Sequence, residues 1–242
     1  MMDKAIKLGR KLSHKMLKNP RCSLSQIATR VTPITLAAAM GHVKCLEVLL
    51  QNPQANIDAV EEYTGANAFW FAAYFGRGQA MRTLAEAGAN VLDCHKSTEE
   101  NALHVAVQHK DYTILDLLVA SEFPLDLPRK GGVTALMIGA RYTGHIDICE
   151  RLIEGGADIN IISEAGDSAL GEAIRYENIE LAKLLMRLGA SPFYEDSDLK
   201  IMSPFYSAIR HKKRWAVELI CDNEDVLWMF TNNHRFAMVY AA

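Results

Sequence analysis

The sequence predicts an all-α protein in which short helix pairs repeat along the chain and stack on one another. The first observation is an interval of 33 to 35 residues between positions that can cap a helix, namely Thr32, Asn67, Asn101, Thr134, Ser168 and Ser203. The second is that apolar residues follow each cap at the positions of one helix face. One helix pair cannot bury such a face alone, so the pairs are expected to stack into a solenoid.

The repeating unit is clearest between Thr134 and Asn160. Thr134 can cap the first helix, and the Gly144-His145 turn leads into a second helix that carries Leu152 on its apolar face. Gly155-Gly156 then ends that helix. The unit is therefore a helix, a turn, a second helix and a hairpin-like loop.

Composition indicates a folded, water-soluble chain with a basic amino end. Hydrophobic residues make up 50% and charged residues 23% of the 242 residues, and the formal net charge is -3. Residues 1–31 nevertheless contain eight Lys or Arg and one acidic residue. The sequence has no apolar run near the roughly 20 residues that span a bilayer and no secretory cleavage pattern. We expect a cytoplasmic or nuclear protein.

The sequence offers no catalytic, metal or cofactor site. It lacks the HExxH, GxGxxG, GxxxxGK[ST] and GxSxG motifs. The five cysteines are an odd number and none lies in a CxxC pair, which argues against a disulfide framework and a zinc site. Cys45 and Cys149 are predicted on core faces. No cofactor is expected, and the chain is predicted not to be an enzyme.

The repeat starts identify a family resemblance. They read TPITLAA, NAFWFAA, NALHVAV, TALMIGA, SALGEAI and SPFYSAI, and Gly41-His42 and Gly144-His145 mark two of the turns. This pattern resembles the ankyrin repeat, which begins TPLHLAA. The resemblance implies helix-turn-helix units joined by β-hairpin-like loops, and a structural role for His104, whose imidazole would bond to nearby backbone. Lys110-Asp111 and Glu177-Asn178 replace the Gly-His turn, and one extra residue precedes Gly144, so we expect local distortion at these turns.

Three regions are predicted. Residues 1–31 form a basic helix that acts as a half-repeat or cap, although a membrane-binding, nucleic-acid-binding or organelle-targeting helix is the alternative. Residues 32–221 hold the repeats that start near 32, 67, 101, 134, 168 and 203. Residues 222–242 form a partial seventh repeat or a closing cap. A partial repeat would mean a fragment of a longer protein, because a free solenoid end exposes its core.

The resemblance also implies where a partner binds. In ankyrin repeats the two residues before the Gly-His turn face the concave groove. The ten predicted partner-binding positions, called the groove residues below, are Met40, Tyr74, Phe75, His109, Arg141, Tyr142, Arg175, Tyr176, Arg210 and His211. In the fourth repeat Thr143 could substitute because of the extra residue.

The composition of the groove residues is typical of an interface. Tyr and Arg supply many of the strong anchors in protein interfaces. The three arginines predict an acidic or phosphorylated partner segment, because a guanidinium pairs bidentately with carboxylate or phosphate. The alternative for the arginines is that they offset helix dipoles, since each lies at the carboxyl end of a first helix.

Two single residues carry open alternatives. Trp70 stands where the repeat pattern has His, so it either fills a gap between repeats or joins Tyr74 in a pocket. Asn160 lies in a segment similar to the one that asparaginyl hydroxylases modify in ankyrin repeats, but Asn is also the usual residue of this loop.

The sequence thus predicts a non-catalytic scaffold that binds a partner protein along the concave groove. The chain is expected to be monomeric on its own, and nucleic acid is not an expected partner. One alternative is a regulatory or targeting module of a larger enzyme or channel. Another is a binder of small molecules or lipid headgroups that uses the basic amino helix and Lys212.

Overall fold

The computed structural model describes residues 31–193 and 203–222, and the chain divides into two compact units, Met1–Glu122 and Phe123–Ala242. The predictions for the basic amino-terminal helix and for the closing segment therefore lie outside the described residues. Twelve helices occupy the described part. No helix in this part of the chain is long and apolar enough to cross a membrane.

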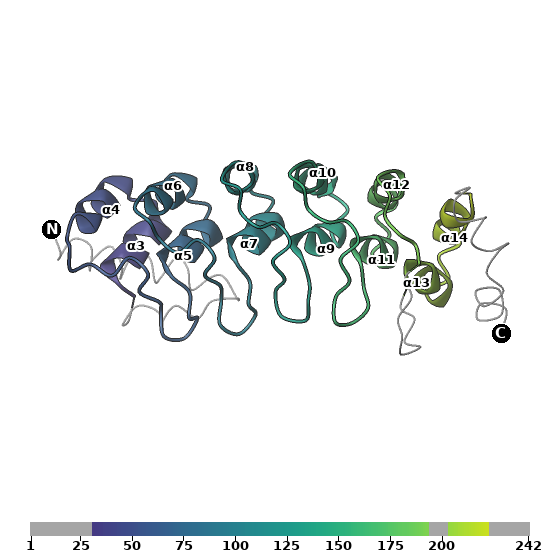
Figure 1. Ribbon diagram of the computed structural model, residues 1–242, viewed down its shortest axis with the longest axis horizontal. Coiled ribbons are helices and arrows are strands. Elements are labelled where there is room, and N and C mark those ends of the chain that lie inside the picture. Colours follow the sequence, from purple (N-terminus) through teal and green to yellow (C-terminus); the bar gives the residue numbers. More distant parts are fainter. Residues whose placement is uncertain (1–30, 194–202, 223–242) are drawn as a thin grey trace. The chain divides into compact units, whose positions relative to one another are not determined.

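The first unit contains three described helix pairs. These are α3 (Pro33–Met40) with α4 (Val43–Leu50), α5 (Ala68–Tyr74) with α6 (Gly78–Glu86), and α7 (Ala102–His109) with α8 (Tyr112–Ala120). The first helices α3, α5 and α7 pack in one row, and α4, α6 and α8 pack in a second row (Figure 1). The sequence repeat is thus a spatial repeat within this unit.

The second unit repeats the same arrangement. Its pairs are α9 (Ala135–Ala140) with α10 (Ile146–Glu154), α11 (Ala169–Arg175) with α12 (Ile179–Arg187), and α13 (Pro204–Arg210) with α14 (Arg214–Cys221). Among the described residues of the two units, the connecting loops carry only isolated β-bridges, Cys94 with Asn101 and Arg129 with Val133. The predicted all-α fold is confirmed.

The helix starts follow the predicted caps. Each of the six capping residues accepts a hydrogen bond through its side chain from a backbone N–H in the first turn. Such a cap stabilises a helix by about 1 kcal/mol. The Asn101 cap is reciprocal, because the Asn101 backbone N–H donates to Nδ1 of the buried His104 at 3.2 Å. The predicted structural role of His104 is confirmed.

The turns between paired helices keep their geometry without glycine. Gly41 has a left-handed φ of 71°, and Lys110, Glu177 and Lys212 take φ values of 55°, 59° and 54° at the matching place. Distortion was therefore wrongly predicted where Lys110 and Glu177 replace glycine. The turn with the extra residue does differ, since it closes through a hydrogen bond from the His145 N–H to the Tyr142 carbonyl at 3.0 Å.

The core of each unit lies between the two helix rows. Leu46, Leu84 and Leu118 are buried in the first unit, and Leu152 is buried in the second. The core prediction is confirmed for Cys149, which is buried, and wrong for Cys45, which is exposed. Of the α4 residues only Leu46 is buried.

Candidate functional site

An aromatic cluster closes the carboxyl end of α5 in the first unit. The Trp70 indole is 3% exposed and stacks on the Tyr74 ring with centroids 5.1 Å apart and planes at 16°. Its Nε1–H donates to the Glu100 carbonyl oxygen at 2.7 Å. Trp70 therefore has part of each role that the sequence left open, filling a gap and contacting Tyr74. The ring fills the gap between α5 and the loop before α7, and it contacts Tyr74 in the core rather than in an open pocket.

The groove residues of this unit are only partly accessible. Tyr74 and Phe75 are half-buried and pack against the core cluster that contains Trp70. The Tyr74 ring also makes edge contacts with Phe75 at 5.1 Å and with the exposed His109 at 5.2 Å. Met40 is half-buried at the end of α3. Tyr74 and Phe75 are therefore not fully exposed, because the Tyr74 ring stacks on Trp70 and Phe75 packs against the same core cluster.

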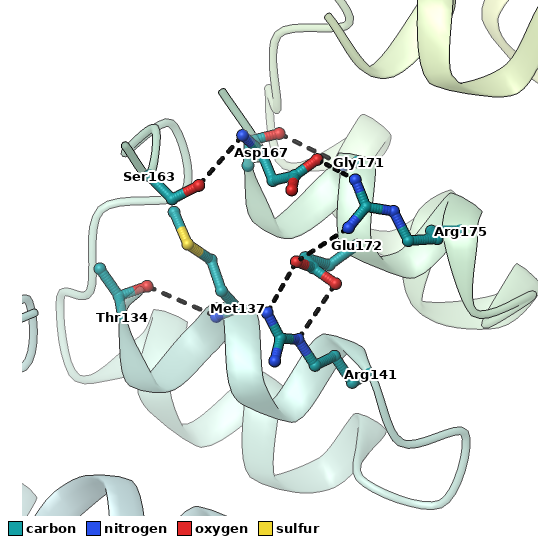
Figure 2. Close-up of polar contacts among 9 residues, drawn as sticks. Thr134, Met137, Arg141, Ser163, Asp167, Gly171, Glu172 and Arg175 are labelled. Atoms are coloured by element: carbon teal, nitrogen blue, oxygen red, sulfur yellow. Dashed lines mark hydrogen bonds and ion pairs between the residues drawn. The ribbon is translucent and has the colours of Figure 1, made fainter. Parts of the chain in front are cut away.

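In the second unit two of the predicted arginines belong to an internal charge network (Figure 2). Arg141 follows α9, and its guanidinium contacts the Glu172 carboxylate twice, Nε to Oε2 at 3.1 Å and Nη2 to Oε1 at 2.9 Å. Arg175 lies at the end of α11. Its Nη2 donates to Asp167, and its Nη1 lies 3.7 Å from the Glu172 Oε1. The network joins α9, α11 and the loop before α11.

The acidic partners of these pairs are buried. Glu172 is 1% exposed, whereas the arginine side chains are about a quarter to a third exposed. Burial by itself would lower the pKa of Arg141, but the hydrogen bonds and the charge of Glu172 outweigh burial and raise the pKa above its usual range. Asp167 is held as well, since its backbone N–H donates to the Ser163 Oγ at 3.1 Å.

The network changes the interpretation of the arginines among the groove residues. Two guanidinium groups face two carboxylates, so Arg141 and Arg175 are largely neutralised within the protein. Sequence reasoning missed Glu172 and Asp167. A signal for Glu172 was present, because SALGEAI places a carboxylate where the other repeat starts have residues of the core face, and a buried carboxylate requires a partner.

Two tyrosines follow the network arginines at the surface. Tyr142 lies two residues after the end of α9, and Tyr176 directly follows α11; they are 44% and 47% exposed. The Tyr142 ring packs on His145 with centroids 4.8 Å apart. Arg210 and His211 are exposed at the end of α13, where they and Arg175 line a small hollow. The structure thus gathers six of the groove residues, including both tyrosines, at the ends of three neighbouring first helices.

Asn160 has a structural role in the loops of the second unit. Its Oδ1 accepts from the Ser191 N–H at 2.8 Å, and its Nδ2 donates to the Gly189 carbonyl at 3.4 Å. Its own N–H donates to Asp158 Oδ1 at 2.8 Å. The side chain is exposed and ties one loop to the next. Its hydroxylation stays a prediction.

Metal chemistry finds no support in residues 31–193 and 203–222. No group of three or more His, Cys, Asp or Glu in these ranges could hold a metal ion. The described cysteines, Cys45, Cys94, Cys149 and Cys221, are free. Burial raises the pKa of the Cys149 thiol to about 12, which keeps it protonated and unreactive at neutral pH.

Comparison with known proteins identifies the repeat. A family model described as ankyrin repeats in three copies matches residues 4–93 and 90–163. The chain belongs to the ankyrin-repeat family. Ankyrin repeats are generally protein–protein interaction modules, and the ankyrin fold is typically non-catalytic.

The chain is similar to proteins of different kinds. An ankyrin repeat domain from Acinetobacter baumannii superposes with a TM-score of 0.66 at 27% identity, covering 77% of this chain and 95% of that one. Human neurogenic locus notch homolog protein 2 is 30% identical over 144 residues, which are 59% of this chain and 6% of that protein. L-asparaginase of Dirofilaria immitis is 28% identical over 179 residues, or 74% of this chain and 28% of that protein. The chain therefore spans a small part of these two curated relatives.

Proposed function

We propose that this ankyrin-repeat protein is a non-catalytic scaffold that binds a partner protein through its groove residues. The observation that carries the proposal is the pair Tyr142 and Tyr176, which stand 44% and 47% exposed on neighbouring first helices. Tyrosine offers a large apolar ring and a polar hydroxyl at a low cost in conformational entropy, so it is enriched at binding hot spots. Two such rings at the ends of neighbouring first helices form a suitable anchor.

The charge network fixes the residues that precede the two tyrosines. Arg141 and Arg175 directly precede the two tyrosines, and both are fixed by the buried Glu172. A fixed backbone lowers the entropy that binding must remove, so the tyrosines are preorganised. In this proposal Arg141 and Arg175 position the binding surface, and the selection of an acidic or phosphorylated segment depends on the groove residues at the end of α13.

The proposal can be tested by capture from cell lysate with the double variant Tyr142→Ala/Tyr176→Ala. The matched control is Val48→Ala/Leu188→Ala, which removes two apolar side chains that are 65% and 47% exposed and belong to the second-helix rows. All three proteins must first give the same circular dichroism spectrum.

We expect specific proteins to bind to the wild type and the control but to be lost from the tyrosine variant, with at least about a tenfold drop in affinity for each purified partner. A photo-crosslinker placed at Tyr176 should join the same proteins. If the tyrosine variant retains the full set of wild-type partners, the groove residues of the second unit are not the binding surface.

A second candidate is that these repeats form a regulatory or targeting module of a larger enzyme or channel. The observation in its favour is that the matching segment is 6% of human notch 2 and 28% of the Dirofilaria L-asparaginase. An antibody against the second unit would test it in cell extract. A native protein much larger than a 242-residue chain supports the module, and a band at the size of the chain itself rejects it.

A further inference from the structure

The last described helix pair, α13 with α14, leaves two large apolar side chains in solvent. Tyr206 and Ile209 of α13 are 37% and 40% exposed. They lie three and six residues after the cap Ser203. Residues three apart on a helix are neighbours on its surface, so the two side chains form one apolar face of α13.

The preceding repeats bury the same two positions. In each of the five first helices before α13, the residues three and six places after the cap are buried. These residues are Thr35 and Ala38, Trp70 and Ala73, His104 and Val107, Met137 and Ala140, and Gly171 and Ile174. Among the described first helices, the exposure of these positions is therefore particular to α13.

Contacts show which side of the repeat the third position after the cap faces. In the first unit, the Trp70 indole donates to the Glu100 carbonyl oxygen in the loop before α7. In the second unit, a Cβ at Gly171 would lie 3.9 Å from the side chain of Pro204, the first residue of α13. Both positions face the repeat that follows. Tyr206 therefore faces the side on which a further layer would stack.

The second helix of the pair shows the same contrast. Val217 of α14 lies four residues after Lys213, the residue before this helix, and it is half-buried. The matching residues, Cys149 of α10 and Ala182 of α12, are fully buried. Both helices of the last described pair thus expose a position that the preceding pairs of the second unit bury.

The chain itself contains a suitable occupant for this face. Residues 236–242 read FAMVYAA, a stretch of hydrophobic residues only, and they lie outside the described part. The stretch starts 33 residues after Ser203, which is one repeat interval. The connection 222–235 is about as long as the connection 155–167 between α10 and the cap of α11. A stretch tethered in this way has an effective concentration on the order of millimolar near α13.

We infer that residues 236–242 dock on the apolar face formed by Tyr206 and Ile209 and cover the end of the last described repeat. Docking removes apolar surface from water on both sides of the contact, which is its driving force. It also covers a patch that would otherwise favour association between chains. The tether favours this occupant over a second copy of the chain or a separate protein, because neither reaches the same local concentration in dilute solution.

Alkylation of an introduced cysteine measures whether the face is covered. Ile209→Cys is prepared in the full 242-residue chain, and Leu188→Cys is the matched control because Leu188 is 47% exposed after the end of α12. Peptide mapping by mass spectrometry follows each site, and slow modification of the buried Cys149 verifies the fold. We expect the thiol at position 209 to react at least about tenfold more slowly than the thiol at position 188, since it is reached only when the docked stretch opens.

A photo-crosslinking amino acid in place of Tyr206 identifies the occupant. The experiment uses an equal mixture of isotope-labelled and unlabelled full chains. We expect crosslinked peptides from residues 236–242 whose two halves carry the same label, because docking occurs within one chain. Val239→Asp should lower the crosslink yield and speed alkylation at position 209, since a charge is costly in an apolar contact. Asn232→Asp adds the same charge outside the stretch and should change neither.

Each contrary outcome overturns the docking. Alkylation at position 209 as fast as at position 188 would show that the face is open. Crosslinks between differently labelled chains would assign the face to a second copy. Crosslinks that miss residues 236–242 would assign it to another segment, and equal effects of Val239→Asp and Asn232→Asp would show that the hydrophobic stretch makes no specific contact.

Discussion

The Arg141 guanidinium holds the buried Glu172 carboxylate through two nitrogen–oxygen contacts, at 3.1 Å and 2.9 Å. The two residues are 31 positions apart and belong to consecutive repeats, so the pair joins α9 to α11 across the repeat interface. A bidentate pair of this kind fixes both side chains. It also determines what happens when either partner is removed.

Arg141→Ala should destabilise the second unit by about 3 kcal/mol, because it leaves a buried carboxylate with only the longer contact to Arg175. Urea denaturation followed by circular dichroism measures the loss. The double variant Arg141→Met/Glu172→Leu should recover more than half of it, since an apolar pair of similar volume needs no charge partner. A double variant less stable than Arg141→Ala alone would contradict this account.

Trp70→Phe should lower the free energy of unfolding of the first unit by about 1 to 3 kcal/mol, because phenylalanine cannot donate a hydrogen bond to the Glu100 carbonyl oxygen. The smaller ring also loses part of the stacked contact with Tyr74. Thermal and urea unfolding provide the measurement. Trp215→Phe, at a half-buried position of α14, is the control and should cost less. Equal losses would mean that the indole N–H contributes nothing specific.

The sequence predicted what depends on local spacing. The caps at Thr32 and Ser203 and the reciprocal bond of His104 follow from residue types at fixed offsets, and the structure has them. The burial of Leu152 follows from the apolar period of its helix. Each of these features is decided within one repeat, so a single sequence contains it.

The sequence could not predict what depends on contacts between repeats. From the sequence, Arg141 is an unpaired groove residue, but in the structure α11 places Glu172 against it. Likewise, the sequence does not show that the Tyr74 ring stacks on Trp70. The unpaired hydroxyl of Ser207 is likewise a property of packing. The sequence thus named positions at the ends of the first helices, and it missed the acids that hold Arg141 and Arg175.

Leu152→Ala should destabilise the second unit by about 2 to 5 kcal/mol, because the fully buried side chain leaves a cavity that its neighbours only partly fill. The repeats of that unit should lose structure together, since each depends on its neighbours for its core. Denaturant titration gives the loss. The control Val48→Ala removes a side chain that is 65% exposed and should change stability by less than about 0.5 kcal/mol.

Lys212→Gly should stabilise the protein by about 1 kcal/mol, because Lys212 holds a left-handed φ of 54° that glycine adopts without steric cost. The side chain is exposed, so little packing is lost. Lys212→Ala is the matched control. It removes the same charge and retains the Cβ, so its melting temperature should stay near the wild-type value. If both variants shift the melting temperature equally, charge rather than backbone conformation is responsible.

Cys149 and Cys45 should differ sharply toward a thiol-specific alkylating reagent at pH 8. Cys45 is exposed and should react as an ordinary thiol, whereas burial raises the pKa of Cys149 to about 12 and closes access to its sulfur. Peptide mapping by mass spectrometry follows each site separately. Modification of Cys149 as fast as Cys45 in the folded protein would contradict the buried position.

The same thiol predicts a pH dependence of stability. An unfolded cysteine loses its proton near pH 8.5, whereas folded Cys149 keeps its proton up to about pH 12. The raised thiol pKa therefore adds to the free energy of unfolding in full below pH 8.5. This stabilising contribution is lost as the pH rises toward 12. Between pH 8.5 and 10 the wild type should lose about 1 to 2 kcal/mol more than Cys149→Ala does over the same interval. Urea denaturation of both proteins at each pH measures this difference, and parallel stability curves would show that the thiol does not remain protonated in the fold.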